Sequence, residues 1–256
     1  MAAETTLVAD SMRYDTNSAV ITATGNVHIA SPDGEVFGDA GSGEAGGGHF
    51  EMRGNVRGHY KDTDGGVVNF SCASAAVDGR DEASRVVTAS GDVKLSKNND
   101  KLSADVIVWH SGAEMYSASG RVLGEFETYS IDADAVSRDV DTFSAQTVRK
   151  FYERGRKMTM TASRADGIIK NNEVTEMTAE GGVVITMPDK DGVMTRATGR
   201  KGIYSIDKGT VVLSGNATVT QPGRVLHSEN IVYFLGTGHI DAQGSPSLTL
   251  ETNRDK

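Results

Sequence analysis

Apolar and polar residues alternate over several long segments of this chain. Between residues 19 and 29, Ile21, Ala23, Val27 and Ile29 share one parity, while threonine, asparagine and histidine occupy the other. The same alternation returns over residues 50–56, 87–95, 177–187 and 211–219. Strict alternation is typical of a β-strand with one apolar and one polar face, whereas a helical stripe of period 3.6 does not fit. The pattern therefore predicts strands in all five segments.

A short motif marks the middle of each such segment: a small residue, glycine, a polar residue and usually valine. We call it the glycine motif, and its glycines are Gly25, Gly54, Gly91, Gly120, Gly181, Gly215 and Gly244. The steps between these glycines are 29, 37, 29, 61, 34 and 29 residues, and a degenerate copy at 145–148 divides the longest step into 27 and 34. Self-similarity at a near-constant period indicates an array of stacked units, here eight.

The glycine of the motif has the parity of the apolar residues, so we expect it on the buried face. Glycine weakens a strand interior, and its recurrence there requires a cause. We expect it to make room inside a narrow interior and to allow the strand to bend or bulge.

A second motif precedes each glycine motif: a small residue beside a polar one, often followed by an aromatic residue. Examples are Ala9-Asp10 with Tyr14 and Ala104-Asp105 with Trp109, and turn-forming residues such as 15–18, 111–112 and 207–209 separate the two motifs. Each unit therefore reads as a hairpin. We predict an all-β antiparallel fold of about eight hairpins, or roughly 16 strands, in one continuous domain over residues 1–256. Parity alone does not show which face of the first strand is buried.

One glycine-rich stretch, residues 38–48, interrupts the regular pattern. Its low complexity indicates a loop or a distorted strand.

Composition narrows the function classes. The formal net charge of -9 argues against a nucleic-acid partner, because phosphates require a basic surface. The lone Cys72 excludes an internal disulfide. No apolar run reaches the roughly 20 residues that span a bilayer. The first residues carry no signal-peptide pattern, which is compatible with a mature chain from which it has been removed.

Candidate catalytic and metal-binding residues are scattered and lack the usual spacings. The six histidines form no ligand pair, and the Asp-x-Asp-Gly sequences at 62–65 and 189–192 lack the downstream glutamate of a calcium loop. Asp10, Asp105 and Asp134 recur at equivalent places in different units, which favours a structural role over catalysis. We therefore expect no enzyme activity, no cofactor and no metal.

A basic cluster interrupts the acidic chain at residues 149–157. Its interpretation stays open between a solvated strand end and a contact for an anionic head group, since Arg and Lys pair well with phosphate. The cations concerned are Arg149, Lys150, Arg154, Arg156 and Lys157.

The paired motifs resemble those of the OstA/LptA family of lipopolysaccharide transport proteins. The clearest copies are Val8-Ala9-Asp10 with Tyr14 and Ala23-Thr24-Gly25-Asn26-Val27, and Leu102-Ser103-Ala104-Asp105 with Trp109 and Ala118-Ser119-Gly120-Arg121-Val122. The resemblance covers most of the chain. It implies a twisted antiparallel β-jellyroll, or β-taco, in the periplasm, whose partners are lipopolysaccharide, other envelope transport components of the same fold, and further copies stacked end to end.

The hypothesis that follows is an apolar groove that shields acyl chains and passes the lipid toward the outer membrane. Burying methylenes supplies about 0.8 kcal/mol each without specific polar contacts. A closed sandwich, in which the same residues pack on one another, demands the same alternation. The predicted lining residues are Ile21, Val27, Ile29, Phe50, Met52, Val56, Val93, Leu95, Val122, Phe126, Phe143, Met177, Val183, Ile185, Val211, Leu213, Val219, Ile240 and Leu248.

Two alternatives belong to other functional classes. One is a structural or adaptor protein of the envelope without lipid cargo. The other is a polysaccharide-binding β-helix, which the repeat length disfavours, since its coils repeat closer to 20–25 residues. A β-propeller is disfavoured because its blades need about 40 residues or more.

Overall fold

The computed structural model describes residues 5–62, 65–79, 85–110, 115–171, 173–189 and 191–251. These residues form eighteen β-strands, and every strand pairing given for them is antiparallel. The all-β antiparallel prediction is confirmed, with two strands more than the roughly 16 expected. The chain divides into two compact units: residues 1–127 with 137–140 form the first unit, and residues 128–136 with 141–256 form the second unit.

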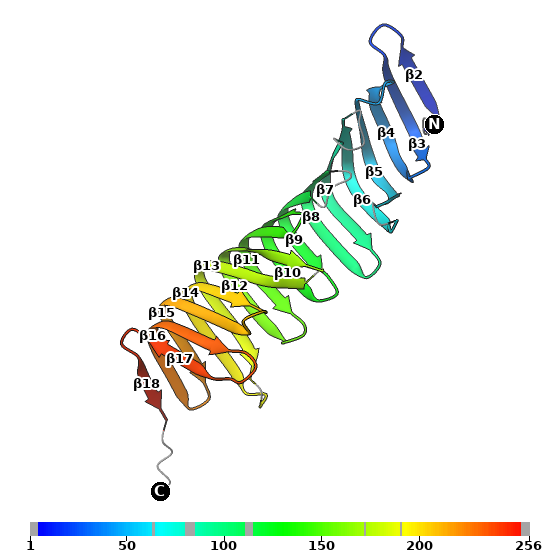
Figure 1. The fold of residues 1–256 in the computed structure, drawn as a ribbon. Helices are drawn as coiled ribbons and strands as arrows, with labels where there is room; N and C mark the ends of the chain where they lie inside the picture. The colour runs from blue at the N-terminus through cyan, green and yellow to red at the C-terminus, as the bar shows by residue number, and fades with distance from the viewer. Residues whose placement is uncertain are drawn as a thin grey trace. The chain divides into compact units, whose positions relative to one another are not determined.

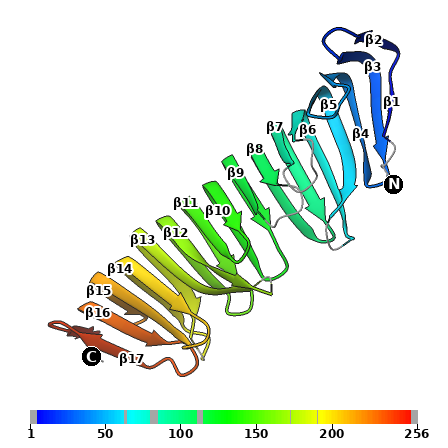
Figure 2. The same cartoon turned by 45° about the horizontal axis from the view of Figure 1, so that its top comes forward.

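The first unit is a run of antiparallel hairpins in which β3 to β9 pair with one another in chain order (Figures 1 and 2). The short β1 and β2 both pair with β3. The strands are β1 (Thr6–Val8), β2 (Ser11–Asp15), β3 (Val20–Ser31), β4 (Gly34–Glu44), β5 (His49–Lys61), β6 (Val67–Asp78), β7 (Val86–Lys97), β8 (Asp100–His110) and β9 (Met115–Glu125).

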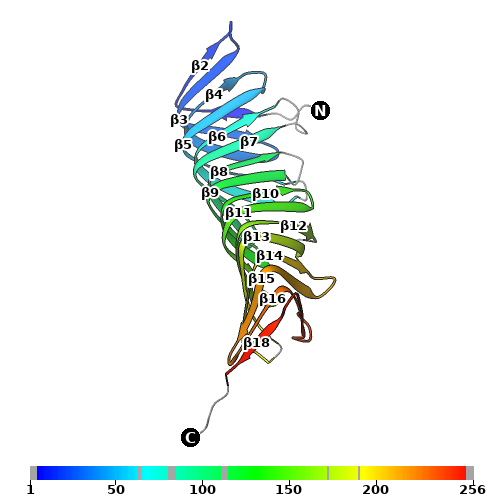
Figure 3. The ribbon, with the colours of Figure 1, turned by 90° about the vertical axis from the view of Figure 1, so that its left-hand side faces the viewer.

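The second unit repeats this arrangement, with β11 to β16 paired in chain order and with β17 and β18 both paired to β16 (Figure 3). Its strands are most of β10 (Tyr129–Asp139), whose residues from 137 on belong to the first unit, and β11 (Thr142–Glu153), β12 (Met158–Lys170), β13 (Glu173–Pro188), β14 (Met194–Ser205), β15 (Thr210–Gln221), β16 (Arg224–Phe234), β17 (Ile240–Gln243) and β18 (Ser247–Leu250).

Six of the seven glycine motifs form a β-bulge in the middle of an odd-numbered strand, whereas Gly244 lies between β17 and β18. In β5, Arg53 pairs with Ala40 and Arg57 pairs with Phe37 across a register shift, so that three residues of β5 lie opposite two residues of β4. Gly54 and Asn55 have φ angles of 74° and 48°, in the left-handed region that glycine and asparagine tolerate best. The predicted bulge is confirmed, and it divides every long strand into two arms.

The burial pattern explains why parity alone left the first strand of each hairpin ambiguous. In β8, Leu102 and Ala104 are buried before the bend, whereas Ile107 is buried and Trp109 is half-buried after it, so the inward parity changes within the strand. In its partner β7, Ala89 before the bulge and Val93 after it are both buried and have the same parity, because the bulge adds one residue to the strand. Both strands thereby keep their apolar side chains on the same side, which we call the inner face.

The expected position of the motif glycine was wrong. Gly25 and Gly54 are half-buried and Gly91 is exposed, because the glycine lies at the outer side of the bulge. A Cβ added to Gly54 would overlap the Asp39 carboxylate, and one added to Gly91 would overlap Ala73. The glycine therefore makes room for a side chain of the preceding strand, which we call the facing residue, and not for the interior. The facing residues are Asp10, Asp39, Ala73, Asp105, Ser163, Arg200 and Glu229.

The glycine-rich stretch at 38–48 is largely strand. Residues 38–44 belong to β4 and only 45–48 form the turn to β5, so the distorted-strand reading is the correct one. Gly38, Gly41 and Gly43 are all buried on the inner face of β4. The inner face of this strand consequently presents backbone where other strands present side chains.

Candidate functional site

The two arms of the strands face each other across the interior of each unit. In the first unit, Tyr60 belongs to the arm after the bulge and Trp109 pairs with Val87 of the arm before it. The Tyr60 and Trp109 rings nevertheless stack, with centroids 6.0 Å apart and an interplanar angle of 11°. This contact shows that the arms fold toward each other and that their inner faces enclose a common interior.

One contact between the arms of the second unit is a hydrogen bond. Arg156, in the turn after β11, donates a hydrogen bond from Nη1 to the Tyr204 hydroxyl, 3.0 Å away. Tyr204 pairs with Val211 of the opposite arm. Burial raises the pKa of Tyr204 to about 12, so the hydroxyl stays protonated at neutral pH.

A second polar group fills the interior of the second unit beside β14. Gln221 donates from Nε2 to Thr195 Oγ1 at 2.7 Å, and both side chains are buried. Tyr233, which is only 1 % exposed, belongs to the other arm. Burial raises the pKa of Tyr233, whereas the Thr195 hydroxyl lowers it. Sequence reasoning found the aromatic positions of the second motif but not their partners, since Thr195 and Gln221 lie outside both motifs.

Most of the predicted lining residues lie on the inner face. Twelve of them are buried: Val27, Met52, Val56, Val93, Val122, Phe143, Met177, Val183, Ile185, Val211, Leu213 and Val219. Another group is half-buried: Ile21, Ile29, Phe50, Leu95, Phe126 and Ile240. Leu248 differs, since it lies on β18 with 58 % of its surface exposed. No charged side chain of the described residues is buried, so the interior is apolar apart from a few hydroxyl and amide groups.

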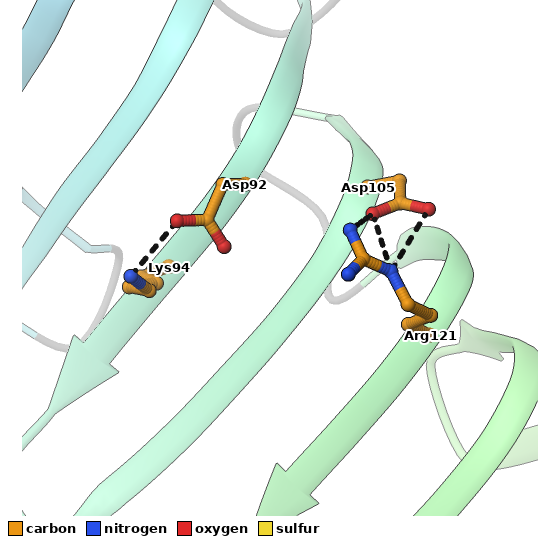
Figure 4. A network of polar contacts seen from close by, with 4 residues as sticks. All are labelled: Asp92, Lys94, Asp105 and Arg121. Atoms are coloured by element: carbon orange, nitrogen blue, oxygen red, sulfur yellow. Dashed lines mark hydrogen bonds and ion pairs between the residues drawn. The ribbon is translucent and has the colours of Figure 1, made fainter.

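Facing aspartates hold the outer side of the bends. Asp10 accepts a hydrogen bond from Asn26 Nδ2 at 2.9 Å, and Asp39 accepts one from Asn55 Nδ2 at 2.8 Å. Asp105 forms an ion pair with Arg121 at 2.5 Å, on the same side of the strands as the Lys94–Asp92 pair (Figure 4). These aspartates are thus occupied by neighbouring strands, in agreement with the structural role inferred from their recurrence.

The side chains of the basic cluster have different partners in the folded chain. Arg149 forms ion pairs with Asp132, at 2.7 Å, and with Asp134, and these carboxylates raise the pKa of the guanidinium. Arg149 thereby completes the degenerate eighth bulge, where Thr147 has a φ of 52°. Lys150 lies over the Tyr152 ring at 5.7 Å, and Arg156 points to Tyr204. Head-group binding by Arg149, Lys150, Arg154, Arg156 and Lys157 stays a prediction.

The remaining candidate metal-binding residues take part in a turn or in a side-chain pair. Asp189 Oδ1 accepts hydrogen bonds from the backbone of Asp191 and Val193, as expected of a turn, whereas residues 63 and 64 of the other Asp-x-Asp-Gly sequence lie outside the described residues. His49 pairs with Asp78, and that hydrogen bond raises the histidine pKa. Within the described ranges no three histidine, cysteine or acidic side chains gather as metal ligands.

Helices able to cross a bilayer are also lacking from the part of the chain that the structure describes.

Comparison with known proteins identifies the family. Residues 74–239 match the family model described as LptA/(LptD N-terminal domain) LPS transport protein. The chain belongs to this family, and it therefore has a role in lipopolysaccharide transport. Comparison with curated proteins gave no match.

Among solved structures, the chain is similar to the crystal structure of LptH, the LptA homologous periplasmic component of the conserved lipopolysaccharide transport device from Pseudomonas aeruginosa. The identity is 17 % and the TM-score 0.35, and the match covers 60 % of this chain and 95 % of that chain.

Proposed function

We propose that this chain is a periplasmic lipopolysaccharide-binding component that shields acyl chains against its inner face and passes the lipid toward the outer membrane. The observation that carries the proposal is the inner face itself. Valine, isoleucine, leucine, methionine and aromatic side chains recur there on successive strands, and no charged side chain of the described residues is buried among them. Such a surface offers acyl chains apolar contact without burying a charged group.

The charge distribution fits a carrier that binds its lipid through the acyl chains. The formal net charge is -9, and arginines such as Arg121 and Arg149 are engaged by aspartates on the outer side of the bends. Anionic head groups therefore gain little from long-range attraction, and affinity depends on the buried methylene groups.

The partners we propose are other transport components of the same fold and further copies of the chain. At the ends of the strand order, β2 exposes Met12 and Tyr14, and β18 exposes Leu248 and Leu250. Edge strands offer unpaired backbone groups to a neighbouring chain, so pairing at these edges would extend the assembly.

One observation favours the adaptor alternative for part of the chain. Val93 and Ile107 of the first unit, like Val211 and Leu213 of the second, have no exposed surface at all, so their own neighbours cover them completely. The β-helix alternative is wrong, because the described strands pair in antiparallel hairpins and not in parallel coils.

Native mass spectrometry of the chain purified after periplasmic expression tests the proposal. We expect a bound species with the mass of an acylated lipid, and we expect its loss when Ile29→Asp and Leu95→Asp place charges on the inner face. Matched substitutions on the outer face, Thr22→Asp and Thr88→Asp, should retain it. A folded wild-type chain that neither carries lipid nor cross-links to added lipopolysaccharide would show that the proposal is wrong.

A further inference from the structure

One turn of the second unit places positive charge at the border of the apolar interior. Residues 154–157 join β11 to β12, and we call this segment the basic turn, since its side chains include Arg154, Arg156 and Lys157. The nearest inner-face residues of the two strands, Phe151 and Met158, are 1 % and 0 % exposed. Cations therefore stand directly beside side chains that are withdrawn from water.

Arg156 lies where the two arms of the second unit meet, and it is half-buried. Its Nη1 donates a hydrogen bond to the Tyr204 hydroxyl at 3.0 Å, and its guanidinium carbon lies 5.9 Å from the centre of the Tyr204 ring. Tyr204 itself is 2 % exposed and pairs in register with Met177 and Val211, which are equally buried. A guanidinium is thus held against the apolar interior by a neutral partner.

The charge of Arg156 is not cancelled by a hydrogen-bonded carboxylate. Glu153 Oε2 lies 3.9 Å from Nη1, which exceeds hydrogen-bonding distance. The Glu153 carboxylate accepts instead from the backbone N–H groups of Gly155 and Arg156, each at 2.8 Å. Among the described residues, Nε and Nη2 of Arg156 have no hydrogen-bond acceptor, so these donors are open to a ligand.

Other arginines of the second unit already have carboxylate partners. Arg164 is exposed and donates from Nε and Nη2 to the two oxygens of Asp166, at 2.7 and 2.9 Å. Arg149, the first cation of the basic cluster, forms ion pairs with Asp132 and Asp134. Neither guanidinium can accept a further anion without giving up an existing partner, in contrast to Arg156.

A phosphate group has the chemistry that this position requires. A guanidinium can donate two parallel hydrogen bonds to phosphate, and a charge-assisted hydrogen bond is about twice as strong as one to a neutral acceptor such as the phenol oxygen. The Tyr204 hydroxyl accepts from Arg156 and keeps its own proton for donation, because burial raises its pKa to about 12. A phosphate oxygen at the Arg156–Tyr204 contact would therefore find donors from both arms.

Two carboxylates oppose an anion at this place. Glu153 and Glu173 both lie close enough to raise the pKa of the tyrosine hydroxyl, whereas Arg156 lowers it. Arg154 and Lys157 of the basic turn are exposed and contribute two further positive charges. Three cations against two carboxylates leave the site with a net positive charge in a chain whose formal net charge is -9.

We propose that the basic turn, through Arg156 and with the Tyr204 hydroxyl, binds a phosphate group of the lipid head. This inference rests on the proposed function and gives the polar end of the lipid a site in the second unit. A lipid phosphate fits better than free phosphate, because Arg156 has apolar side chains on one side and solvent on the other, as does the junction between a head group and its acyl chains. The basic cluster then separates into two sets, of which Arg154, Arg156 and Lys157 form the site while Arg149 and Lys150 do not contribute.

The test compares detergent-dispersed lipopolysaccharide with the same lipopolysaccharide after removal of its phosphates, each titrated against the purified full chain. Arg156→Gln should weaken binding of the phosphorylated lipid about tenfold, as expected for the loss of one charge-assisted hydrogen bond, and should leave binding of the dephosphorylated lipid unchanged. Arg164→Gln is the matched control, since it removes an arginine of the same unit that Asp166 already engages, and it should affect neither lipid.

Two further variants separate a ligand role from a structural one. Arg156→Lys keeps the charge but not the planar fork, so its affinity for the phosphorylated lipid should lie between those of wild type and Arg156→Gln. It also keeps the test decisive if Arg156→Gln does not fold, which circular dichroism reports. Glu173→Gln removes an opposing charge and should strengthen binding of the phosphorylated lipid alone, an effect that a merely structural arginine does not explain.

The outcomes distinguish the site from the function. Unchanged affinity in both Arg156 variants, or an equal loss for both lipids, would overturn the phosphate site and leave the proposed function intact. Inorganic phosphate in large molar excess should not displace the lipid, and displacement by it would show a free-phosphate site and overturn the assignment to a lipid head. A folded wild-type chain that binds neither form of lipopolysaccharide would overturn both the site and the proposed function.

Discussion

The Asp39 carboxylate occupies the space that a side chain at Gly54 of the next strand would need, and it accepts a hydrogen bond from Asn55 Nδ2 at 2.8 Å. Asp10 has the same relationship to Gly25 and Asn26. The two motifs of each repeat are therefore the two halves of one contact, made across neighbouring strands at the bend. This contact fixes the place of the bulge, and with it the parity of the inner face on both sides.

Gly54→Ala should destabilise the first unit markedly. The substitution places a side chain at a φ of +74° and drives its Cβ into Asp39. The left-handed conformation alone costs about 1 kcal/mol relative to glycine, and the overlap adds to this cost. Urea denaturation followed by far-UV circular dichroism measures the total.

Gly47→Ala is the matched control, because Gly47 also has a φ of +74° but no neighbouring atom within 4 Å of an added Cβ. We expect it to lose only the conformational part, about 1 kcal/mol. Equal losses at both positions would contradict the steric role assigned to Asp39.

Truncation of equivalent inner-face residues should affect the units differently. Val219→Ala removes two carbons from a side chain that is 2 % exposed, so we expect a loss of about 2 kcal/mol. Ile29→Ala removes three carbons from a half-buried side chain, and we expect a smaller loss despite the larger deletion. Thermal denaturation compares the two variants, and a larger loss for Ile29→Ala would argue against the difference in packing.

Alkaline pH should unfold the protein through its buried tyrosines. Burial raises the pKa of both Tyr60 and Tyr204 to about 12, whereas an unfolded tyrosine ionises near pH ~10. Below the unfolded pKa both states hold the proton and stability is unaffected. As the pH rises from there through the folded pKa, the unfolded state ionises first and the free energy of unfolding falls.

Tyr60→Phe and Tyr204→Phe should each weaken this alkaline dependence, one from each unit. Denaturation midpoints measured across the alkaline range report the effect. A wild-type midpoint that stays constant there would be inconsistent with buried, protonated hydroxyls.

Cys72 should resist thiol reagents in the native protein. Its side chain is buried on β6, and burial raises the thiol pKa to about 11, so little thiolate forms at neutral pH. Labelling with a maleimide should become fast only in denaturant, in parallel with unfolding of the first unit. Fast labelling of the folded chain would show that β6 opens locally.

The alternation of apolar residues and the recurring glycines predict the architecture, because the buried face of a strand and the left-handed backbone angles of a bulge depend on local residue types. The sequence was sufficient to predict antiparallel hairpins, about eight repeats, bends at the glycines and an inner face containing Val27, Val183 and Leu213. It was not sufficient to place Gly54, since parity continues through the bulge and gives a glycine on the outer side the same phase as a buried residue.

What only the tertiary structure decided is which inner faces are filled. Gly43 and Tyr204 occupy equivalent places in two similar repeats, yet Gly43 lies against the Phe50 ring of the next strand, whereas Tyr204 receives a hydrogen bond from Arg156, 48 residues earlier in the chain. Such contacts join residues from opposite arms, so no local pattern records them. Local alternation determines that a side chain faces inward, whereas the distance between the arms determines what it meets there.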